Sequence, residues 1–381
     1  MQKTKGKNPR LDARLQPLDS RLQRHGGNIY AFARSRGISP EQVVDFSASI
    51  NPLGWPRGVE TAYRRIFTRM AHYPEPYAET LTKALATYHD LDPYSVLVGN
   101  GSTQLIYLLA RELAPQRALI VAPSFSEHEA ALRQHGAQVD HFVLRPPSFA
   151  LSLERFKAVL EQNYDVLILT NPNSPTGAFI PCTECEQIVR CCRQARTRLV
   201  VDETFVDWVE KASLKHQAAH SPHVIVLRSL TKFFALPGLR VGYVIGHSRL
   251  IMRLRTLMEP WSVNAIAQEV ARSCLQDAVF PQRSRAFMER ERTWLSAQLM
   301  KIEGLRPFPS HANFLLVQIT QPGVLAAKVV RRLAEENLLV RDCENFVGLG
   351  KRFFRVAVRT RSENRRLLAA LRASVEVKLP C

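Results

Sequence analysis

The sequence predicts an α/β protein with a mainly parallel, seven-stranded sheet covered by helices, followed by a smaller α+β domain. Apolar runs rich in Val, Ile and Leu recur through the middle of the chain, as is typical of strands buried on both faces. Amphipathic stretches such as STQLIYLLARELA separate several of these runs, which is the strand–helix alternation of a parallel sheet. After residue 261 the pattern changes to long helices, then the apolar segments ANFLLVQI and FFRVAVR with further helices.

The elements of the large sheet follow from the positions of the apolar runs. The expected strands are 96–101, 118–123, 139–144, 165–170, 199–204, 224–229 and 240–246. We expect four segments along the chain: a basic, mobile tail at 1–24, a segment at 25–52 that joins the small domain, a large domain at 53–261 and a small C-terminal domain at 262–381. Ligands of such sheets gather beyond the carboxyl ends of the strands, so the functional residues should follow those ends.

The composition is that of a soluble globular protein, with 46% hydrophobic and 23% charged residues. There is no apolar run of the 18 or more residues that span a bilayer, and the N-terminus lacks the apolar centre of a secretory signal. Asp12 and Asp19 argue against a transit peptide, so we expect a cytoplasmic protein without a membrane partner. The formal charge of +18 arises from scattered basic residues, which favours an anionic small substrate over nucleic acid.

Seven cysteines in a chain of this length argue against a disulfide framework. Four of them lie in CTECEQIVRCC, which is open to interpretation as a zinc site. Thr183 and Glu186 have the spacing of a capping box at a helix start. Cys185 and Cys192 then share one helical face with Ile188 and Val189, so the sequence favours buried thiols and no metal site.

Two loops that follow expected strands are candidates for ligand binding. GNGSTQLI places Gly99, Gly101, Ser102 and Thr103 at a helix start, where free backbone N–H groups suit a phosphate, although a simple turn fits equally well. NPNSPTG, residues 171–177, is stiffened by two prolines. Its amides and hydroxyls can face a ligand, or it can be an ordinary loop.

A carboxylate and an amine follow two further strands. Asp202 ends a buried strand, where it needs a cation or hydrogen-bond donors, or else it caps a helix. Lys232 lies after the strand VIVLRS and is placed to react with a carbonyl cofactor. Ser229, Thr231 and Arg240 offer hydroxyls and a guanidinium for a phosphate beside that lysine.

Taken together, these motifs resemble the fold-type I, class I/II aminotransferase-like enzymes that use pyridoxal 5′-phosphate. The resemblance covers nearly all of the chain after residue 24. It implies that Lys232 binds the cofactor covalently and that Asp202 pairs with the pyridine nitrogen. The phosphate would be held by Gly101, Ser102, Thr103, Ser229, Thr231 and Arg240. Phe125 would stack on the ring with His128 behind it, and Tyr73 would reach the phosphate from the other subunit of a homodimer.

Two positions depart from the family pattern. Ser174 stands where relatives often have Asn, so either Asn173 or the Ser174 hydroxyl would contact the phenolic oxygen of the cofactor. Phe205 stands where many aminotransferases have Tyr, which removes one hydrogen bond to that oxygen.

The two ends of the chain resemble the L-threonine-O-3-phosphate decarboxylases of cobalamin biosynthesis, in HGGNIYAFARSRGI, DFSASINPLGWP and VRDCENFVGLGKRFFRVAVR. This resemblance implies a carboxy-lyase that forms (R)-1-amino-2-propanol O-2-phosphate. Its substrate would meet His25, Gly26, Ser49, Ser174, Arg341 and Arg355. Ser49 replaces an Asn of the pattern, and each arginine alone fits a surface salt bridge. The alternatives are a histidinol-phosphate aminotransferase-like transaminase and a decarboxylase that prefers L-serine O-phosphate.

Overall fold

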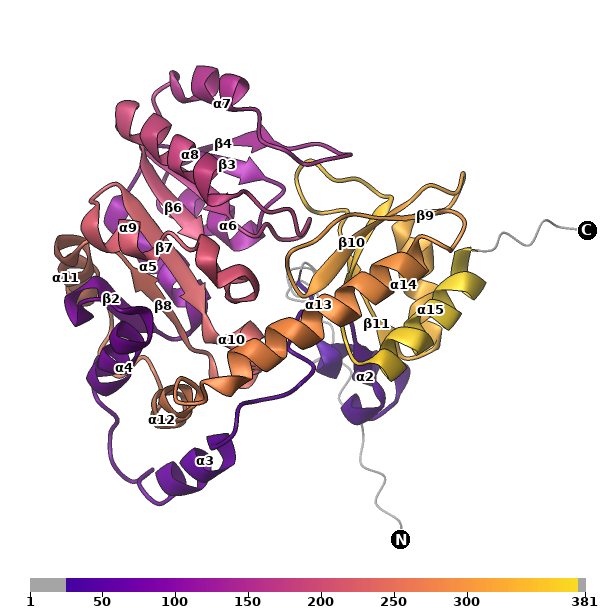
Figure 1. Ribbon diagram of the computed structural model, residues 1–381, viewed down its shortest axis with the longest axis horizontal. Helices are drawn as coiled ribbons and strands as arrows, with labels where there is room; N and C mark the ends of the chain where they lie inside the picture. Colours follow the sequence, from indigo (N-terminus) through magenta and orange to yellow (C-terminus); the bar gives the residue numbers. More distant parts are fainter. Residues whose placement is uncertain (1–24, 376–381) are drawn as a thin grey trace, which may run out of the picture.

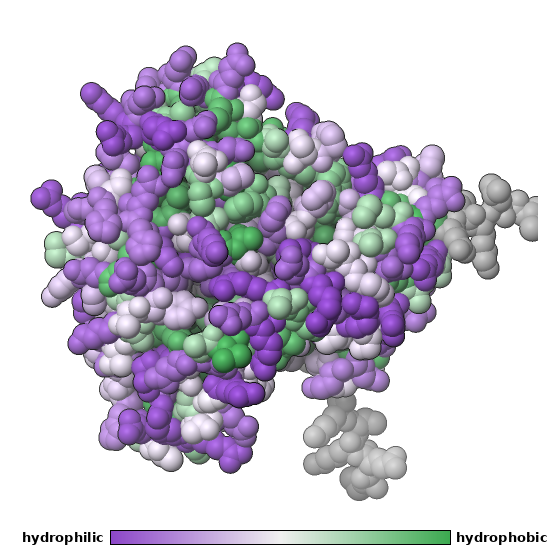
Figure 2. Space-filling model, in the orientation of Figure 1, coloured by the Kyte–Doolittle hydropathy of each residue, from purple (hydrophilic) through white to green (hydrophobic). Residues whose placement is uncertain are grey.

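The computed structural model describes residues 25–375, so the expected N-terminal tail at 1–24 lies outside the described residues. In this part of the chain no helix combines the length and the apolar character that crossing a bilayer demands. Figure 1 shows a large domain built on one sheet, beside a smaller domain that holds the C-terminal helices. Hydrophilic side chains cover most of the face seen in Figure 2.

The seven expected strands of the large sheet are all present, with ends that differ by at most a few residues. They are β2 (Val96–Gly99), β3 (Arg117–Ala122), β4 (Gln138–Val143), β5 (Val166–Thr170), β6 (Arg198–Asp202), β7 (Val224–Ser229) and β8 (Gly242–Ile245). Their order is β2-β8-β7-β6-β5-β3-β4, and only β8 runs antiparallel to its neighbours. The start of β8 therefore lies at the same edge of the sheet as the carboxyl ends of the other six strands.

Helices cover both faces of this sheet, because alternate side chains of each strand enter two separate cores. One face packs on α5 (Gly101–Leu113), α6 (Ser126–Gln134) and α11 (Ser248–Leu257). The opposite face packs on α4 (Glu79–His89), α7 (Leu153–Leu160), α8 (Cys182–Gln194) and α9 (Lys215–His220), which Figure 1 shows in front of the strands. The short α10 (Leu230–Phe233) directly follows β7, whereas α3 (Val59–Phe67) lies apart from the sheet, at the bottom of Figure 1.

Helix α8 starts differently from the sequence prediction. It begins at Cys182 with Pro181 at the N-cap, and Thr183 makes no capping hydrogen bond, so the predicted capping box is wrong. The physical reason is that the carbonyl of Pro181 already accepts the first helical hydrogen bonds, from the N–H groups of Glu184 and Cys185. The expected buried face is confirmed, and burial raises the pKa values of the Cys185 and Cys192 thiols to about 12.

The C-terminal part forms a second sheet. Its helices are α12 (Ala265–Cys274), α13 (Val279–Leu299), α14 (Ala326–Glu335) and α15 (Arg361–Val375), and its strands are β9 (Leu305–Pro307), β10 (Phe314–Ile319), β11 (Leu338–Leu339), β12 (Arg341–Asp342) and β13 (Phe353–Ala357). Four strands pair antiparallel in the order β12-β13-β10-β9. Helix α12 packs on α3 and α4, whereas α13 runs along β9 and β10.

The N-terminal segment connects the two domains. After α2 (Ile29–Arg36), the short strand β1 (Val44–Asp45) pairs in parallel with β11. The chain then crosses to the large domain, where the N–H of Asn51 donates to the carbonyl of Lys232 at 3.0 Å. The side chain of Asn51 donates to the carbonyl of Phe233 and to Ser284. The first part of the chain therefore anchors the turn that presents Lys232.

Candidate active site

A cavity of about 220 Å³ opens where the carboxyl ends of the large sheet meet the small domain. Sheet register brings its polar residues together, since Thr170 at the end of β5 pairs with Asp202 at the end of β6, and Ser229 at the end of β7 pairs with Gly242. It is lined by His25, Gly26, Ser47, Ala48, Ser49, Ser102, Thr103, Phe125, Ser126, Thr170, Ser174, Asp202, Thr204, Phe205, Ser229, Thr231, Lys232, Arg240, Arg341, Phe346 and Arg355.

Most residues that the sequence singled out line this cavity. The residues that the sequence singled out and that are not among its lining residues are Gly99, Gly101, His128, Asn173 and Tyr73. Six lining residues were missed: Ser47, Ala48, Ser126, Thr170, Thr204 and Phe346. Ala48, Ser126 and Thr204 are direct neighbours of residues that the sequence did identify, and Ser47 lies two positions before Ser49, so the spacing held a usable signal. Phe346 and Thr170 carried no separate signal, because an aromatic in a loop and a threonine at a strand end are common.

Asp202 is a buried carboxylate held by two donors. Its Oδ2 lies 2.9 Å from Nε2 of His128, and its Oδ1 accepts the backbone N–H of Thr204 at 2.9 Å. Burial by itself would raise the pKa of Asp202, but the hydrogen bonds from His128 and Thr204 hold it below the usual value. A carboxylate that stays ionised in the cavity wall is suited to a protonated ring nitrogen.

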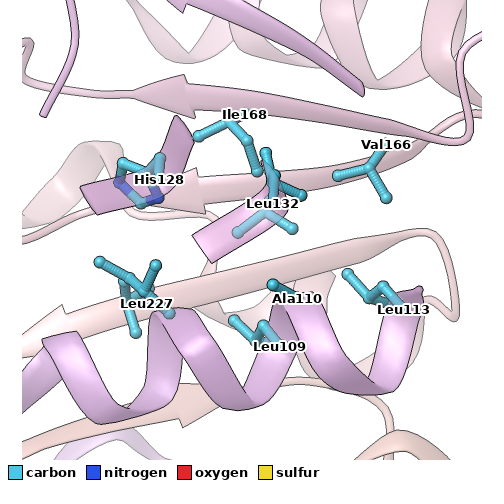
Figure 3. Close-up of a pocket in the computed structure, with 10 residues that line it drawn as sticks. Leu109, Ala110, Leu113, His128, Leu132, Val166, Ile168 and Leu227 are labelled. Carbon is cyan, nitrogen blue, oxygen red and sulfur yellow. The ribbon is translucent and has the colours of Figure 1, made fainter. Parts of the chain in front are cut away.

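His128 is fixed from behind by apolar packing. Figure 3 shows its ring beside a small apolar cavity of about 20 Å³, between α5, α6 and the strands, with Leu132, Ile168 and Leu227 around it. Because these neighbours carry no polar side-chain groups, Asp202 is the partner that the imidazole finds on this side of the sheet.

Lys232 is a buried amine among cations. It makes no ion pair with any described residue, and burial, reinforced by Arg355 and Arg240, lowers its pKa from 10.5 to about 8. A sizeable fraction of the amine is therefore neutral near physiological pH, which is the form that attacks a carbonyl.

Beside Lys232 lies a cradle for a phosphate. Ser229 Oγ and Thr231 Oγ1 are 2.8 Å apart. Gly101 starts α5 with a φ of 75°, and a Cβ there would lie 2.6 Å from Nη2 of Arg240. A Cβ on Gly242 would lie 2.7 Å from the backbone nitrogen of Ser102, so both glycines permit a close approach of backbone and guanidinium. Hydroxyls, a helix start and a guanidinium thus converge on one spot.

Arg341 and Arg355 enter the cavity from the small domain. Arg355 donates from Nη1 to Oγ of Ser174 at 3.0 Å and from Nη2 to the carbonyl of Ser47 at 2.9 Å. Its Nε has no partner among the described residues. Burial is the main cause that lowers the pKa of Arg355, to about 10. Buried guanidinium groups of this kind suit anions.

Ser174, Ser49 and Phe205 occupy the positions that depart from the family pattern. Ser174 accepts a hydrogen bond from Arg355, so its own hydroxyl hydrogen can still be donated into the cavity. Ser49 is 1% exposed and its Oγ has no partner among the described residues, which leaves a buried hydroxyl for a ligand. Phe205 packs edge-on against Phe314 and offers the cavity only carbon atoms.

Asn173 is placed differently from the expectation. Its amide nitrogen donates to the carbonyl of Pro123, and its Oδ1 accepts from the Thr176 hydroxyl. Both ends of the amide therefore hold the loop, and Asn173 is not among the residues that line the cavity. Ser174 is the residue of this loop that reaches the cavity.

Tyr73 also lies away from the cavity of its own chain. Its side chain is 85% exposed, and its ring lies 5.3 Å from that of Trp261. The expected contact from another subunit involves a second chain, so within one chain Tyr73 stays a surface residue.

The donor set fits pyridoxal 5′-phosphate group by group. The cavity offers the amine of Lys232, which can be neutral, for the aldehyde and the ionised carboxylate of Asp202 for the ring nitrogen. The aromatic ring of Phe125 suits the ring face, and a separate cradle suits the phosphate. The fold and this site together define a pyridoxal-phosphate-dependent enzyme of fold type I.

Comparison with known proteins agrees. The model of the family "Aminotransferase class I and II" matches residues 41–371, and the chain belongs to this family. A threonine-phosphate decarboxylase from Salmonella typhimurium is 37% identical over 350 residues, which cover 91% of this chain and 95% of that protein.

Two solved structures share the fold at 27% identity, and each covers 86% of this chain and 98% of its own. The L-threonine-O-3-phosphate decarboxylase from Porphyromonas gingivalis has a TM-score of 0.77. The histidinol-phosphate aminotransferase from Clostridium acetobutylicum has a TM-score of 0.80. Backbone similarity therefore does not choose between decarboxylation and amino transfer.

Proposed function

We propose that this enzyme decarboxylates L-threonine O-3-phosphate to (R)-1-amino-2-propanol O-2-phosphate, the linker precursor of cobalamin biosynthesis. The observation that carries the proposal is the pair of buried guanidinium groups, Arg341 and Arg355, that face one cavity beside Lys232. A phosphorylated amino acid brings two anions to such a site, a phosphate and a carboxylate. The 37% identity to a threonine-phosphate decarboxylase supports the choice of substrate.

The residues that would hold the cofactor follow from the donor set. Ser102, Thr103, Ser229, Thr231 and Arg240 would bind its phosphate. Asp202 would pair with the ring nitrogen, Phe125 would lie against the ring, and Ser174 would donate to the phenolic oxygen. When bound, pyridoxal phosphate withdraws electrons from whichever bond at the substrate Cα stands perpendicular to its ring.

The protein decides which bond that is by fixing the substrate at a distance from Cα. Arg341 and Arg355 would hold the anionic groups of the substrate, and binding energy at the phosphate would fix the rotamer that presents the carboxylate for cleavage. Phe205 and Phe346 line the cavity with apolar rings, and an apolar surrounding of the carboxylate would favour departure of neutral CO2.

Lys232 is the proposed proton donor to Cα. Its pKa of about 8 leaves the ammonium and the amine both populated near neutral pH, so Nζ can deliver a proton and recover one. Its attachment on α10, directly after β7, keeps it at the floor of the cavity.

We also propose a homodimer in which Tyr73 completes the site of the partner. The ring of Tyr73 contacts the exposed Trp261, and the preceding stretch of chain carries three more large hydrophobic side chains that are exposed, Tyr63, Phe67 and Met70. Such residues are typical of a protein interface. Mixing Lys232→Ala with Tyr73→Phe tests this, because a shared site restores activity above either parent, whereas sites confined to one chain give no gain.

The experiment that tests the proposed reaction compares three substrates on the holoenzyme. O-phosphothreonine should release CO2 without any 2-oxo acid. O-phosphoserine measures the preference for the extra methyl group, which is worth only a modest factor in binding. Amino transfer from histidinol phosphate to 2-oxoglutarate, with no release of CO2, would overturn the proposal in favour of a transaminase.

A further inference from the structure

Glu127 lies behind a cavity residue rather than in the cavity itself. It is the second residue of α6, and its side chain is 22% exposed. Its Oε1 lies 2.9 Å from Nε2 of His25, and its Oε2 accepts the hydroxyl of Tyr107 at 2.9 Å. The two carboxylate oxygens therefore have separate partners, one on α5 and one in the N-terminal segment.

His25 is held at the cavity wall by this contact. Its ring centroid lies 5.4 Å from that of Phe125, and both rings line the cavity. Because Nε2 faces Glu127, the ring nitrogen left for a ligand is Nδ1. The adjacent Gly26 packs so closely on the carbonyl of Ser47 that a Cβ would lie 2.4 Å from it, and the N–H of Gly27 donates to Oγ of Ser47 at 2.7 Å. The backbone at 25–27 is thus fixed as well.

We propose that Glu127 is a positioning residue for the phosphate group of the substrate and that it acts through His25. The inference rests on the proposed function, since it assigns the phosphate of that substrate to the His25 side of the cavity. Glu127 contacts neither substrate nor cofactor. It orients the imidazole by holding Nε2, which leaves Nδ1 as the ring nitrogen for the phosphate.

The chemistry follows from the two ring nitrogens. A neutral imidazole that donates from Nε2 to Glu127 presents a lone pair at Nδ1, which repels a phosphate oxygen. With a proton on each nitrogen, the ring donates to Glu127 and to the phosphate at once, and it lies between two anions. Carboxylate partners of this kind fix the orientation of functional histidines in many sites. A neutral amide at residue 127 would keep the shape of the contact and lose its charge.

The contact also ties two parts of the chain together. His25 belongs to the segment that joins the small domain through β1, whereas Glu127 and Tyr107 belong to helices on the large sheet. Glu127 therefore keeps the N-terminal segment against the cavity wall.

The test compares holoenzymes carrying Glu127→Gln, Glu127→Asp and His25→Gln, alone and with the double variant H25Q/E127Q. The matched control is Glu129→Gln, because Glu129 lies in the same helical turn and pairs with Arg133 and His141 instead. We expect Glu127→Gln to raise KM for O-phosphothreonine about tenfold with little change in kcat, as loss of one charge-assisted contact predicts. Glu127→Asp should recover part of this loss, and the double variant should be no worse than His25→Gln.

A second readout does not require turnover. Inorganic phosphate added to the holoenzyme should raise the melting temperature of the wild type and of Glu129→Gln more than that of Glu127→Gln. If wild type decarboxylates O-phosphothreonine but Glu127→Gln keeps its KM and its phosphate response, the role of Glu127 is refuted and the proposed reaction stands. If wild type releases no CO2, the proposed reaction fails, and the phosphate response alone decides whether His25, positioned by Glu127, binds an anion. If Glu127→Gln lowers kcat and leaves KM unchanged, Glu127 has a merely structural role and the proposal is refuted.

Discussion

Arg341 on β12 and Arg355 on β13 are directly opposite each other in an antiparallel strand pair. Opposite residues project to the same face of a sheet, so both guanidinium groups meet the same cavity. Arg341 also donates to Oδ1 of Asn345 at 2.8 Å, and it lies over the ring of Phe346. Arg341 is among the causes that lower the pKa of Arg355, so the two positive charges repel each other, and an anionic substrate held by both would offset that repulsion.

This relationship predicts a stability effect of the substrate. O-phosphothreonine should raise the melting temperature of the wild-type holoenzyme. The increase should be much larger than the one caused by sodium chloride at the same ionic strength. Arg355→Met should abolish most of this increase and raise KM by roughly 10- to 100-fold, because a hydrogen bond to a charged group contributes about 1.5–3 kcal/mol. An unchanged thermal response in Arg355→Met would place the anion elsewhere.

The low pKa of Lys232 predicts how cofactor binding depends on pH. Burial, with Arg355 and Arg240 nearby, lowers its pKa to about 8, so the reactive neutral amine appears as pH rises through about 8 rather than 10.5. The rate at which the apoprotein recovers its cofactor absorption band should rise with a midpoint near pH 8. Lys232→Ala should show no such band, and a midpoint near 10 in the wild type would contradict a buried amine.

The lowered pKa of Lys232 also predicts the direction in which the stability of the apoprotein changes with pH. Since the folded pKa of Lys232 is lowered, the unfolded chain binds more protons between pH 8 and 10.5, and this group makes the folded state more stable as pH rises through that range. The free energy of unfolding of the apoprotein should therefore rise relative to that of Lys232→Met between pH 8 and 10.5, with a constant difference below and above that range. Parallel curves across the range would argue against this titration.

Asp202 should matter through its charge. Asp202→Asn keeps the contact with Thr204 possible but removes the ion that would keep the ring nitrogen protonated. We expect kcat to fall by roughly a hundredfold or more, in line with removal of a preorganised electrostatic contact. His128→Gln should have a smaller effect in the same direction, and equal activity of Asp202→Asn and wild type would exclude the assigned role.

Replacing the buried Arg228 should lower the free energy of unfolding. It is fully buried, with Nη2 at 3.0 Å from Asp207 and 2.6 Å from Glu210, and Glu203 is close by. Arg228→Met removes the buried cation from Asp207 and Glu203, whereas Glu210 keeps its ion pair with Lys215, so the free energy of unfolding should fall by about 3–5 kcal/mol. Arg190→Met, at an exposed pair with Glu186, should change it by less than about 1 kcal/mol. Urea unfolding measures both variants.

The strands and the place of the site could be predicted because they depend on local patterns. Val, Ile and Leu runs identified β2 to β8, and parallel strands bring residues such as Asp202 and Ser229 to one edge whatever the details of the helices. The hydroxyl and guanidinium groups of the cavity could therefore be predicted from their place after the ends of those strands.

The unpredicted features depend on contacts between distant segments. His25 and Glu127 are 102 positions apart, and neither residue alone indicates the other. The register that places Arg341 opposite Arg355 depends on the loop between the strands, and the buried Arg228 finds its carboxylates in a different segment. Asn173 was misplaced because the sequence does not reveal that Pro123 and Thr176 use both ends of its amide.

The measurement that tests the central claim most directly is product analysis by mass spectrometry after incubating the holoenzyme with O-phosphothreonine in D2O. The account predicts that CO2 and aminopropanol phosphate form in equal amounts, and that the product carries one deuterium at the carbon that lost the carboxylate. Recovery of O-phosphothreonine with deuterium at Cα and no CO2, or its conversion to a 2-oxo acid, would contradict the account, because the Cα–H bond and not the carboxylate would then be the one that the protein holds perpendicular to the ring.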